Sequence, residues 1–136
     1  MSKVTVLDAS AIIAFLQGEP GAELVGQALH SQRCIVSAAN QAEVIAKALD
    51  RDAKPEAITT ILADLAYYVV DVPVADGEQA GWIRGQTKRV GLSLGDRLCL
   101  ALAQRMRARV LTADRAWLEV SKTLGVDVVC IRPASH

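Results

Sequence analysis

The chain has 136 residues, with 15 Lys plus Arg and 15 Asp plus Glu, so its formal net charge is zero. This length fits one domain, and the balanced charge excludes a protein that attracts nucleic acid through a strong overall positive field. Hydrophobic residues make up 51% of the sequence and aromatic residues only 4%. We therefore expect a core of Ala, Val, Leu and Ile. We also expect that a partner covers some of the apolar surface and that neither Trp is simply exposed to solvent.

The cysteines and the first residues indicate the cellular compartment. Cys34, Cys99 and Cys130 are odd in number, far apart and embedded in apolar runs, which predicts reduced, buried thiols and no metal-thiolate site. The first 16 residues hold one Lys and an apolar stretch interrupted by Asp8, which is not the pattern of a signal peptide. The longest later apolar run, 98–103, is too short to span a bilayer. We expect a cytoplasmic protein without a membrane partner.

Short β-branched runs alternate with apolar segments of helical spacing along the whole chain. In chain order the expected elements are a strand at 4–7, helices at 11–16 and 22–29, a strand at 34–36, helices at 38–49 and 55–65, a strand at 68–72, helices at 75–87 and 94–106, a strand at 110–112, a helix at 116–124 and a strand at 128–131. Parallel strands need helical crossovers to return. The alternation therefore predicts a three-layer α/β/α fold around a parallel sheet.

Four acidic residues fall where such a fold binds its ligands. Asp8 ends the first strand and Asp114 lies two residues beyond the fourth, whereas Glu43 and Asp96 lie in the opening turns of two helices. In a parallel α/β sheet the carboxyl ends of the strands and the amino ends of the crossover helices share one edge. We therefore expect all four carboxylates to point toward one end of the molecule.

Local structure offers another explanation for each acid taken singly. Asp and Glu are favoured as helix caps and in first turns. Asn40 with Glu43, and Ser93 with Asp96, have the spacing of a capping box, and Asp114 could cap the helix that follows it. Capping gives no reason, however, for acids to follow two strands as well as to open two helices.

Carboxylates gathered at one place must either be protonated or hold a cation. Two of them about 4 Å apart repel each other by roughly 4 kcal/mol at an effective dielectric constant of about 20. A site with oxygen ligands alone favours Mg²⁺ or Mn²⁺ over zinc. His30 and His136 lie away from the four acids in the sequence, and we expect surface or helix-end positions for them. The four acids are thus the predicted ligands of a divalent cation.

Four short stretches carry a family resemblance, namely VLDAS at 6–10, SAANQAE at 37–43, GD at 95–96 and LTAD at 111–114. Together they resemble the PIN-domain family, and the short length is similar to its VapC-type toxin branch. The resemblance covers almost the whole chain, so we expect residues 1–136 to form one PIN-like domain. It implies a five-stranded sheet in the order 3-2-1-4-5, with Asp8 and Asp114 on neighbouring strands.

The resemblance also implies supporting roles for two hydroxyl side chains. Ser10 would hydrogen-bond near Asp8, and Thr112 would brace the acid cluster. A helix cap and a β-branched strand end are the local alternatives for these two residues.

Similar PIN nucleases cut single-stranded or looped RNA, so the resemblance implies a metal-dependent endoribonuclease that is the toxin of a type II toxin–antitoxin pair. A small antitoxin that masks the site and a homodimer are the implied protein partners. One or two Mg²⁺ or Mn²⁺ ions are compatible with the residues, with Asp8 as the shared ligand of a pair and Asp96 and Asp114 holding the second ion. Arg97 and Arg115 directly follow predicted ligands and are candidate RNA phosphate contacts.

Other interpretations fit less well. The haloacid-dehalogenase pattern needs a second Asp two positions after the first-strand Asp, where this chain has Ser10. A phospho-receiver domain needs an acidic pair before that Asp and a Lys after a late strand, and neither is evident. The alternative that stays open is a non-catalytic PIN-like module that only binds RNA or a partner. The sequence does not name the RNA target, because groove shape and loops determine it.

Overall fold

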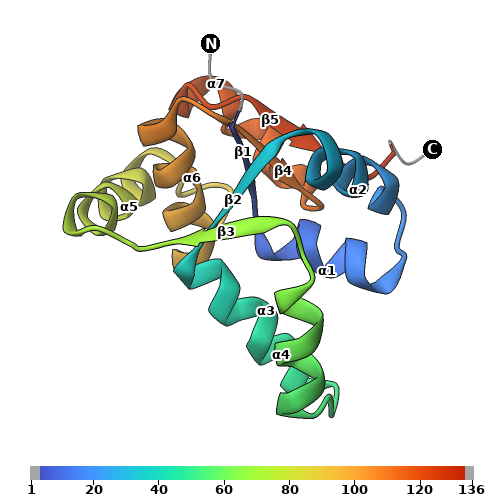
Figure 1. Ribbon diagram of the computed structural model, residues 1–136. Coiled ribbons are helices and arrows are strands. Elements are labelled where there is room, and N and C mark those ends of the chain that lie inside the picture. The colour runs from blue at the N-terminus through green and yellow to red at the C-terminus, as the bar shows by residue number, and fades with distance from the viewer. Residues whose placement is uncertain (1–3, 134–136) are drawn as a thin grey trace.

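The protein is built around a five-stranded parallel sheet (Figure 1), seen in a computed structural model that describes residues 4–133. The strands are β1 Val4–Leu7, β2 Arg33–Ser37, β3 Tyr67–Val70, β4 Arg109–Thr112 and β5 Val128–Cys130. Their order across the sheet is β3-β2-β1-β4-β5, and every neighbouring pair is parallel. The predicted α/β class and strand order are confirmed.

Both faces of the sheet are buried, because side chains alternate along each strand. Val6, Ile35 and Val110 belong to one hydrophobic cluster, whereas Leu7 and Leu111 belong to a second. The two clusters lie on opposite faces, and aliphatic residues dominate both of them, as the composition predicts. This continuous apolar packing holds the central strands β1 and β4 rigidly side by side.

Helices cover the two faces as separate layers (Figure 1). They are α1 Ala9–Gln17, α2 Ala22–Ser31, α3 Ala38–Asp50, α4 Pro55–Ala63, α5 Val74–Gln86, α6 Leu94–Met106, the 3₁₀ helix η1 Arg115–Glu119 and α7 Ser121–Leu124. The cluster that contains Val6 includes residues of α5, α6, η1 and α7, and the cluster that contains Leu7 includes residues of α1, α2 and α3. The α3–α4 hairpin extends away from the sheet.

The segment 116–124, predicted as one helix, is instead the 3₁₀ helix η1 followed by the single-turn helix α7. Trp117 is fully buried, and Val120, three residues later, is 3% exposed. In a 3₁₀ turn the side chains at i and i+3 eclipse each other, so both point directly into the core, whereas an α-helix would offset them around its axis. Packing of this pair therefore overrides the continuous helix.

Two expectations about burial are only partly correct. Trp117 is buried, but Trp82 on α5 is 75% exposed, so the expectation that neither Trp lies on the surface is wrong for this residue. Cys34 and Cys99 are buried free thiols, whereas Cys130 is only partly buried because β5 is an edge strand. Within residues 4–133, none of the helices combines the length and the apolar character needed to cross a membrane.

Candidate active site

Asp8 lies at the carboxyl end of β1 and is 4% exposed. Its carboxylate accepts hydrogen bonds from Thr112 Oγ1 at 2.6 Å, from Ser10 Oγ at 2.8 Å and from the backbone N–H of Ala11 at 2.8 Å. The last of these makes Asp8 the N-cap of α1, so the helix begins at Ala9 and not at residue 11, and the alternative of Ser10 as its cap is wrong. Ser10 and Thr112 thus contact Asp8 directly.

The environment of Asp8 disfavours its negative charge. Burial raises the pKa of the carboxyl from its ordinary value of 3.8 to about 6, although the hydrogen bonds from Thr112, Ala11 and Ser10 oppose the rise. The nearby charge of Asp96 adds to it. At neutral pH Asp8 is therefore a buried anion whose three donors only partly offset the loss of solvation.

Glu43 is held by a residue that the sequence analysis assigned to another role. The N-cap of α3 is Ser37, whose Oγ accepts from the backbone N–H of Ala39 at 3.2 Å, so the predicted Asn40 cap is wrong. Asn40 is 1% exposed, and its Nδ2 donates to Glu43 Oε1 at 2.7 Å and to the backbone oxygen of Gly95 at 3.2 Å. The Asn40 side chain therefore fixes Glu43 and ties α3 to the start of α6.

The close approach of α3 and α6 depends on the absence of a side chain at residue 95. An ideal Cβ placed on Gly95 would lie 2.7 Å from the Cδ atom of Glu43. That distance is well inside van der Waals contact, so a side chain at this position would displace the carboxylate. Gly95 lets Glu43 of one helix lie against the first turn of the other.

Asp96 and Asp114 both have the local roles that capping predicts. Ser93 and Asp96 form a complete capping box at the start of α6, with the backbone N–H of Ser93 donating to Asp96 Oδ2 at 3.0 Å. Asp114 caps η1 by accepting from the N–H of Ala116 at 3.0 Å. Burial raises the pKa of Asp96, and the charge of Asp114 raises it further. Capping and proximity to other acids therefore coexist in these residues.

All four predicted acids line one open pocket of about 270 Å³, which we call the acid pocket. Its lining residues are Asp8, Ala9, Ser10, Ile13, Glu43, Lys47, Asp96 and Asp114. Burial raises the pKa of the Cys99 thiol well above its ordinary value, and the nearby charges of Asp8, Asp96 and Glu43 raise it further. The expectation that the four acids share one edge of the sheet is confirmed.

The acids surround the pocket without closing on one point. In the part of the chain that the structure describes, no three His, Cys, Asp or Glu side chains form a ready-made metal-ligand set. Glu43, Asp96 and Asp114 are each turned toward a local donor, and mutual repulsion favours such separated positions. Their carboxylates must turn inward for several of them to contact one ion.

Lys47 is a pocket residue that the sequence analysis missed. It lies four residues after Glu43 on α3, and this spacing places both side chains on the same helix face. The spacing was a usable signal in the sequence. Lys47 therefore adds a positive charge to the lining of the acid pocket.

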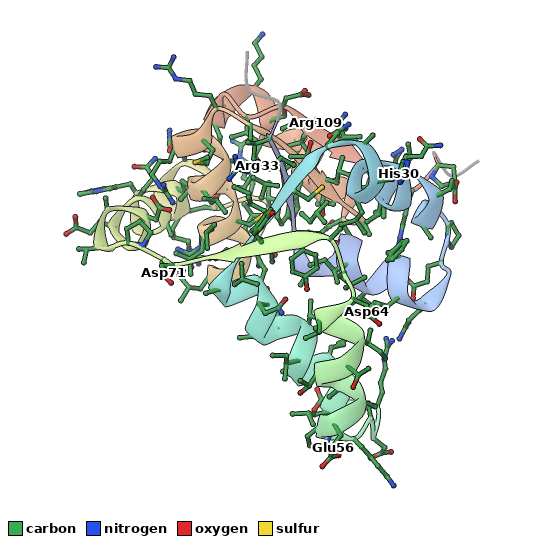
Figure 2. All side chains as sticks on the ribbon, in the orientation of Figure 1. His30, Arg33, Glu56, Asp64, Asp71 and Arg109 are labelled. Carbon is green, nitrogen blue, oxygen red and sulfur yellow. The ribbon has the colours of Figure 1, made fainter. Side chains whose placement is uncertain are left out.

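The two predicted RNA-contacting arginines differ in the structure. Arg97 Nη1 donates to the backbone oxygen of Ala80 on α5 at 2.8 Å, so this side chain joins two helices inside the fold, in place of the free phosphate contact that we expected. Arg115 is exposed beside Asp114. His30 is exposed at the end of α2 (Figure 2), as predicted, whereas His136 lies outside the described residues.

The fold and the acid pocket define a class of protein. A family model described as PIN domain matches residues 5–123, a range that contains all four acids, and the chain belongs to the PIN-domain family. Its curated relatives include ribonuclease VapC42 of Mycobacterium tuberculosis, which is 34% identical over 108 residues. That match covers 73% of this chain and 82% of the relative. VapC ribonuclease Mb2780c of Mycobacterium bovis gives the same values.

Solved structures at lower identity share the fold. A toxin–antitoxin complex from Klebsiella pneumoniae has a TM-score of 0.72 at 20% identity, and the match covers 96% of this chain and 99% of the other. VapC20 of Mycobacterium tuberculosis, described as a toxin that cleaves the sarcin–ricin loop, has a TM-score of 0.68 at 18% identity. That match covers 95% of this chain and 99% of the other. The predicted PIN-like architecture is confirmed.

Proposed function

We propose that this chain is a metal-dependent endoribonuclease that hydrolyses phosphodiester bonds of RNA, and that it is the toxin of a type II toxin–antitoxin pair. The observation that carries the proposal is the acid pocket, which brings Asp8, Glu43, Asp96 and Asp114 to the carboxyl edge of the sheet. The names of the VapC ribonuclease relatives support the same activity.

The donor set of the acid pocket fits Mg²⁺ or Mn²⁺, because the four acids present oxygen ligands without His or thiolate. Asp8 is a buried anion that needs a counter-charge, which a divalent cation provides. When bound, such a cation activates a water for attack on the phosphodiester and neutralises charge that develops on the phosphate. The four acids are the residues that would hold it.

The chain's own residues divide the work according to their exposure. Asp8 lies at the base of the acid pocket, where Thr112 and Ser10 fix its orientation. Glu43 and Asp96 are half-buried and Asp114 is exposed, so their carboxylates have room to turn toward a cation. An RNA phosphate would approach from this open side.

We also propose a protein partner, the cognate antitoxin, and a homodimer. Large apolar side chains stay exposed on several helices, including Leu49 at 47%, Ile61 at 47%, Val74 at 81% and Trp82 at 75%. Apolar surface of this extent supports burial against other chains. A DNA-bound VapBC complex from Salmonella typhimurium, with a TM-score of 0.71 at 18% identity over 96% of this chain and 99% of the other, shows an assembly built on the same fold.

Cleavage of RNA by the purified, metal-stripped protein tests the activity. We expect single-stranded RNA to stay intact in EDTA and to be cut after addition of Mg²⁺ or Mn²⁺. Asp8→Asn should abolish cleavage. The control variant is Asp64→Asn, which replaces an exposed acid at the end of α4 (Figure 2) and should cleave RNA like the wild type.

Full activity of the Asp8→Asn protein would contradict the proposal. If the wild-type protein binds RNA but does not cleave it in the presence of either metal, the non-catalytic PIN-like module is favoured instead. That alternative has one observation in its favour, namely the local hydrogen bonds that hold the acids apart.

A further inference from the structure

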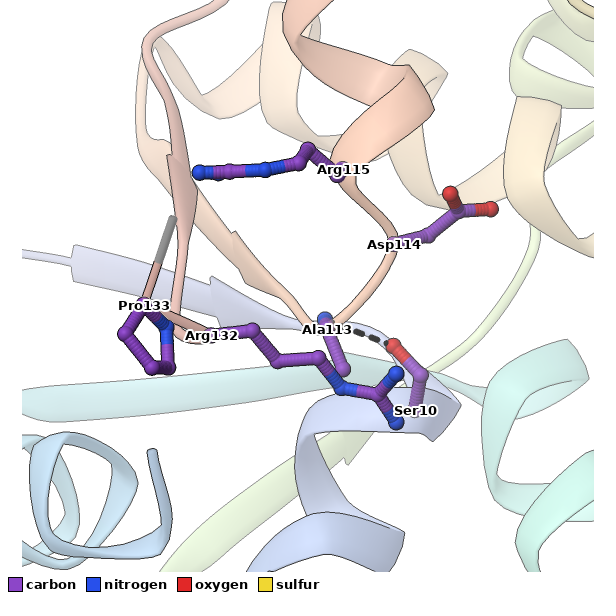
Figure 3. A pocket seen from close by; sticks show the side chains of 6 residues that line it. All are labelled: Ser10, Ala113, Asp114, Arg115, Arg132 and Pro133. Carbon is purple, nitrogen blue, oxygen red and sulfur yellow. Dashed lines mark hydrogen bonds between the residues drawn. The ribbon is translucent and has the colours of Figure 1, made fainter. Parts of the chain in front are cut away.

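A second pocket lies next to the acid pocket and differs from it in charge (Figure 3). This pocket, of about 550 Å³, is lined by Ser10, Ala113, Asp114, Arg115, Arg132 and Pro133, and we call it the arginine pocket. It shares Ser10 and Asp114 with the acid pocket. The two hollows therefore adjoin along the carboxyl edge of the sheet.

The walls of the arginine pocket are held by contacts between segments that are far apart in sequence. The N–H of Ala113 donates to Ser10 Oγ at 2.8 Å, which joins the loop after β4 to α1. The N–H of Ile131 donates to the backbone oxygen of Thr112 at 2.8 Å, so the chain that leads to Arg132 continues the pairing of β5 with β4. The backbone on both sides of the pocket is thus fixed by the fold.

Gly21 adds a third constraint on the same wall. Its φ is +95°, and an ideal Cβ on it would lie 2.8 Å from the backbone carbon of Ile131. The turn between α1 and α2 therefore presses directly on the residue before Arg132. This close approach constrains the backbone of Ile131, directly before Arg132.

Contacts with other protein groups neutralise little of the positive charge of Arg115 and Arg132. Within residues 4–133, Arg115 makes no side-chain hydrogen bond or ion pair. Among the described residues Arg132 forms one ion pair, a long one of 3.7 Å from Nη2 to Glu19 Oε1, and its side chain is 54% exposed. Figure 3 shows the Arg132 guanidinium reaching toward Ser10, while the Asp114 carboxylate points away from Arg115. With two arginines and one acid, Asp114, in its lining, this pocket is more positive than the acid pocket beside it.

We propose that the arginine pocket binds a phosphate of the RNA strand that flanks the phosphate held at the acid pocket. The inference rests on the proposed ribonuclease function and extends it to Arg115 and Arg132 as substrate-binding residues. Guanidinium groups make paired, charge-assisted hydrogen bonds to phosphate oxygens. A nucleic acid strand has phosphates at regular intervals, so one strand can place successive phosphates in two adjoining pockets.

RNA binding without cleavage provides the first test. Anisotropy of a short, fluorescein-labelled single-stranded RNA would be measured in EDTA with the wild type, Arg115→Gln, Arg132→Gln and the double variant. The matched control is Arg51→Gln. It replaces an exposed arginine in the turn after α3 and removes one positive charge, as each single variant does. Thermal melts establish that each variant is folded.

We expect each single variant to weaken RNA binding about tenfold at low salt, the effect of one lost charge-assisted contact. Each should also reduce the slope of log K against log salt by about 0.7, the value for one phosphate on a single strand. In Mg²⁺ or Mn²⁺ the same variants should raise KM and leave kcat nearly unchanged. A double variant that binds RNA like Arg51→Gln would overturn the proposal.

Two further outcomes separate this inference from the function on which it rests. Metal-dependent cleavage with a KM that the arginines do not affect would refute the subsite and leave the ribonuclease intact. Arginine-dependent RNA binding by a protein that never cleaves would support the subsite and refute the ribonuclease. If oligoglutamate binds the wild type in an arginine-dependent way while RNA binding is unchanged in the variants, the pocket receives an acidic protein segment, and the RNA proposal fails.

Discussion

The hydroxyl of Thr112, at the end of β4, donates a 2.6 Å hydrogen bond to the carboxylate of Asp8 at the end of β1. The same oxygen accepts a 3.0 Å hydrogen bond from the backbone N–H of Asp114. Because β1 and β4 are paired neighbours, one buried side chain contacts two acids that follow different strands. The positions of Asp8 and Asp114 in the acid pocket therefore depend on Thr112, a residue that carries no charge.

Replacement of this hydroxyl is the first prediction. Thr112→Val keeps the side-chain shape but removes a donor to Asp8 and an acceptor for Asp114. We expect a loss of about 1 to 3 kcal/mol in the free energy of unfolding, because a buried charge loses a partner. RNA cleavage should fall, and its pH profile should move to higher pH as the pKa of Asp8 rises. Thr112→Ser, which keeps the hydroxyl, should retain most of the stability and most of the RNA cleavage. An unchanged pH profile in Thr112→Val would contradict this role.

Stability of the metal-free protein should depend on Asp8 in a direction set by its pKa. The folded-state pKa of about 6 lies above the ordinary value of 3.8, so the folded protein prefers the protonated form. The stabilising contribution is complete below pH 3.8 and is lost as the pH rises through about 6. The loss amounts to about 3 kcal/mol at most, since one pKa unit corresponds to about 1.4 kcal/mol.

Asp8→Asn should therefore be more stable than the wild type in EDTA above about pH 7, with the difference shrinking toward about pH 4. Urea unfolding at several pH values measures this. Asp64→Asn, which replaces an exposed acid, should show no such pH-dependent difference. Equal pH dependence in the wild type and Asp8→Asn would show that Asp8 is not a destabilised buried anion.

A methyl group at residue 95 should disturb the acid pocket. Gly95→Ala would place Cβ against the Glu43 carboxylate, which must move aside. Because this carboxylate is the free end of a flexible side chain, we expect little loss of stability but reduced RNA cleavage. Gly81→Ala is the control, because Gly81 lies inside α5 with open space around it and Ala there should stabilise the helix by about 0.5 to 1 kcal/mol. RNA cleavage at the wild-type rate in Gly95→Ala would mean that Glu43 moves aside without consequence.

Addition of a divalent cation should stabilise the folded protein. At a Mg²⁺ or Mn²⁺ concentration about 100 times the Kd, binding to the native state alone adds about 2.7 kcal/mol. We expect the Tm of the wild type to rise on titration with either ion and to return to its starting value in excess EDTA. Asp8→Asn should show little of this shift. A Tm that does not respond in the wild type would refute the cation site.

Much of the protein was predictable from local sequence patterns. The β-branched run before Asp8 and the alternation of strands with helices determine a parallel α/β sheet, because such strands need helical crossovers and burial on both faces. Asp8 and Asp114 follow strands and Asp96 lies in the first turn of α6, which together indicate a shared edge for these acids. Glu43 was expected in the first turn of its helix but lies in the second turn of α3, still near the same edge. These predictions use only periodicity and neighbouring residues, which is why they hold.

Tertiary contacts decided what the sequence left open. Asn40 has the spacing of a cap, yet its amide bridges Glu43 and Gly95, because the approach of α3 to α6 buries the side chain between the two helices. Arg97 turns to the carbonyl of Ala80 for a similar reason.

The acid pocket shows the same division between sequence and tertiary structure. The direction of the chain, which the sequence pattern reveals, brings the four acids to one edge. The burial of Asp8, alone among the four, and its three hydrogen-bond donors are seen only in the folded structure. Only the folded structure, too, placed Arg132 beside Arg115. Burial and pairing depend on segments that are distant in sequence, whereas the shared edge depends only on the direction of the chain.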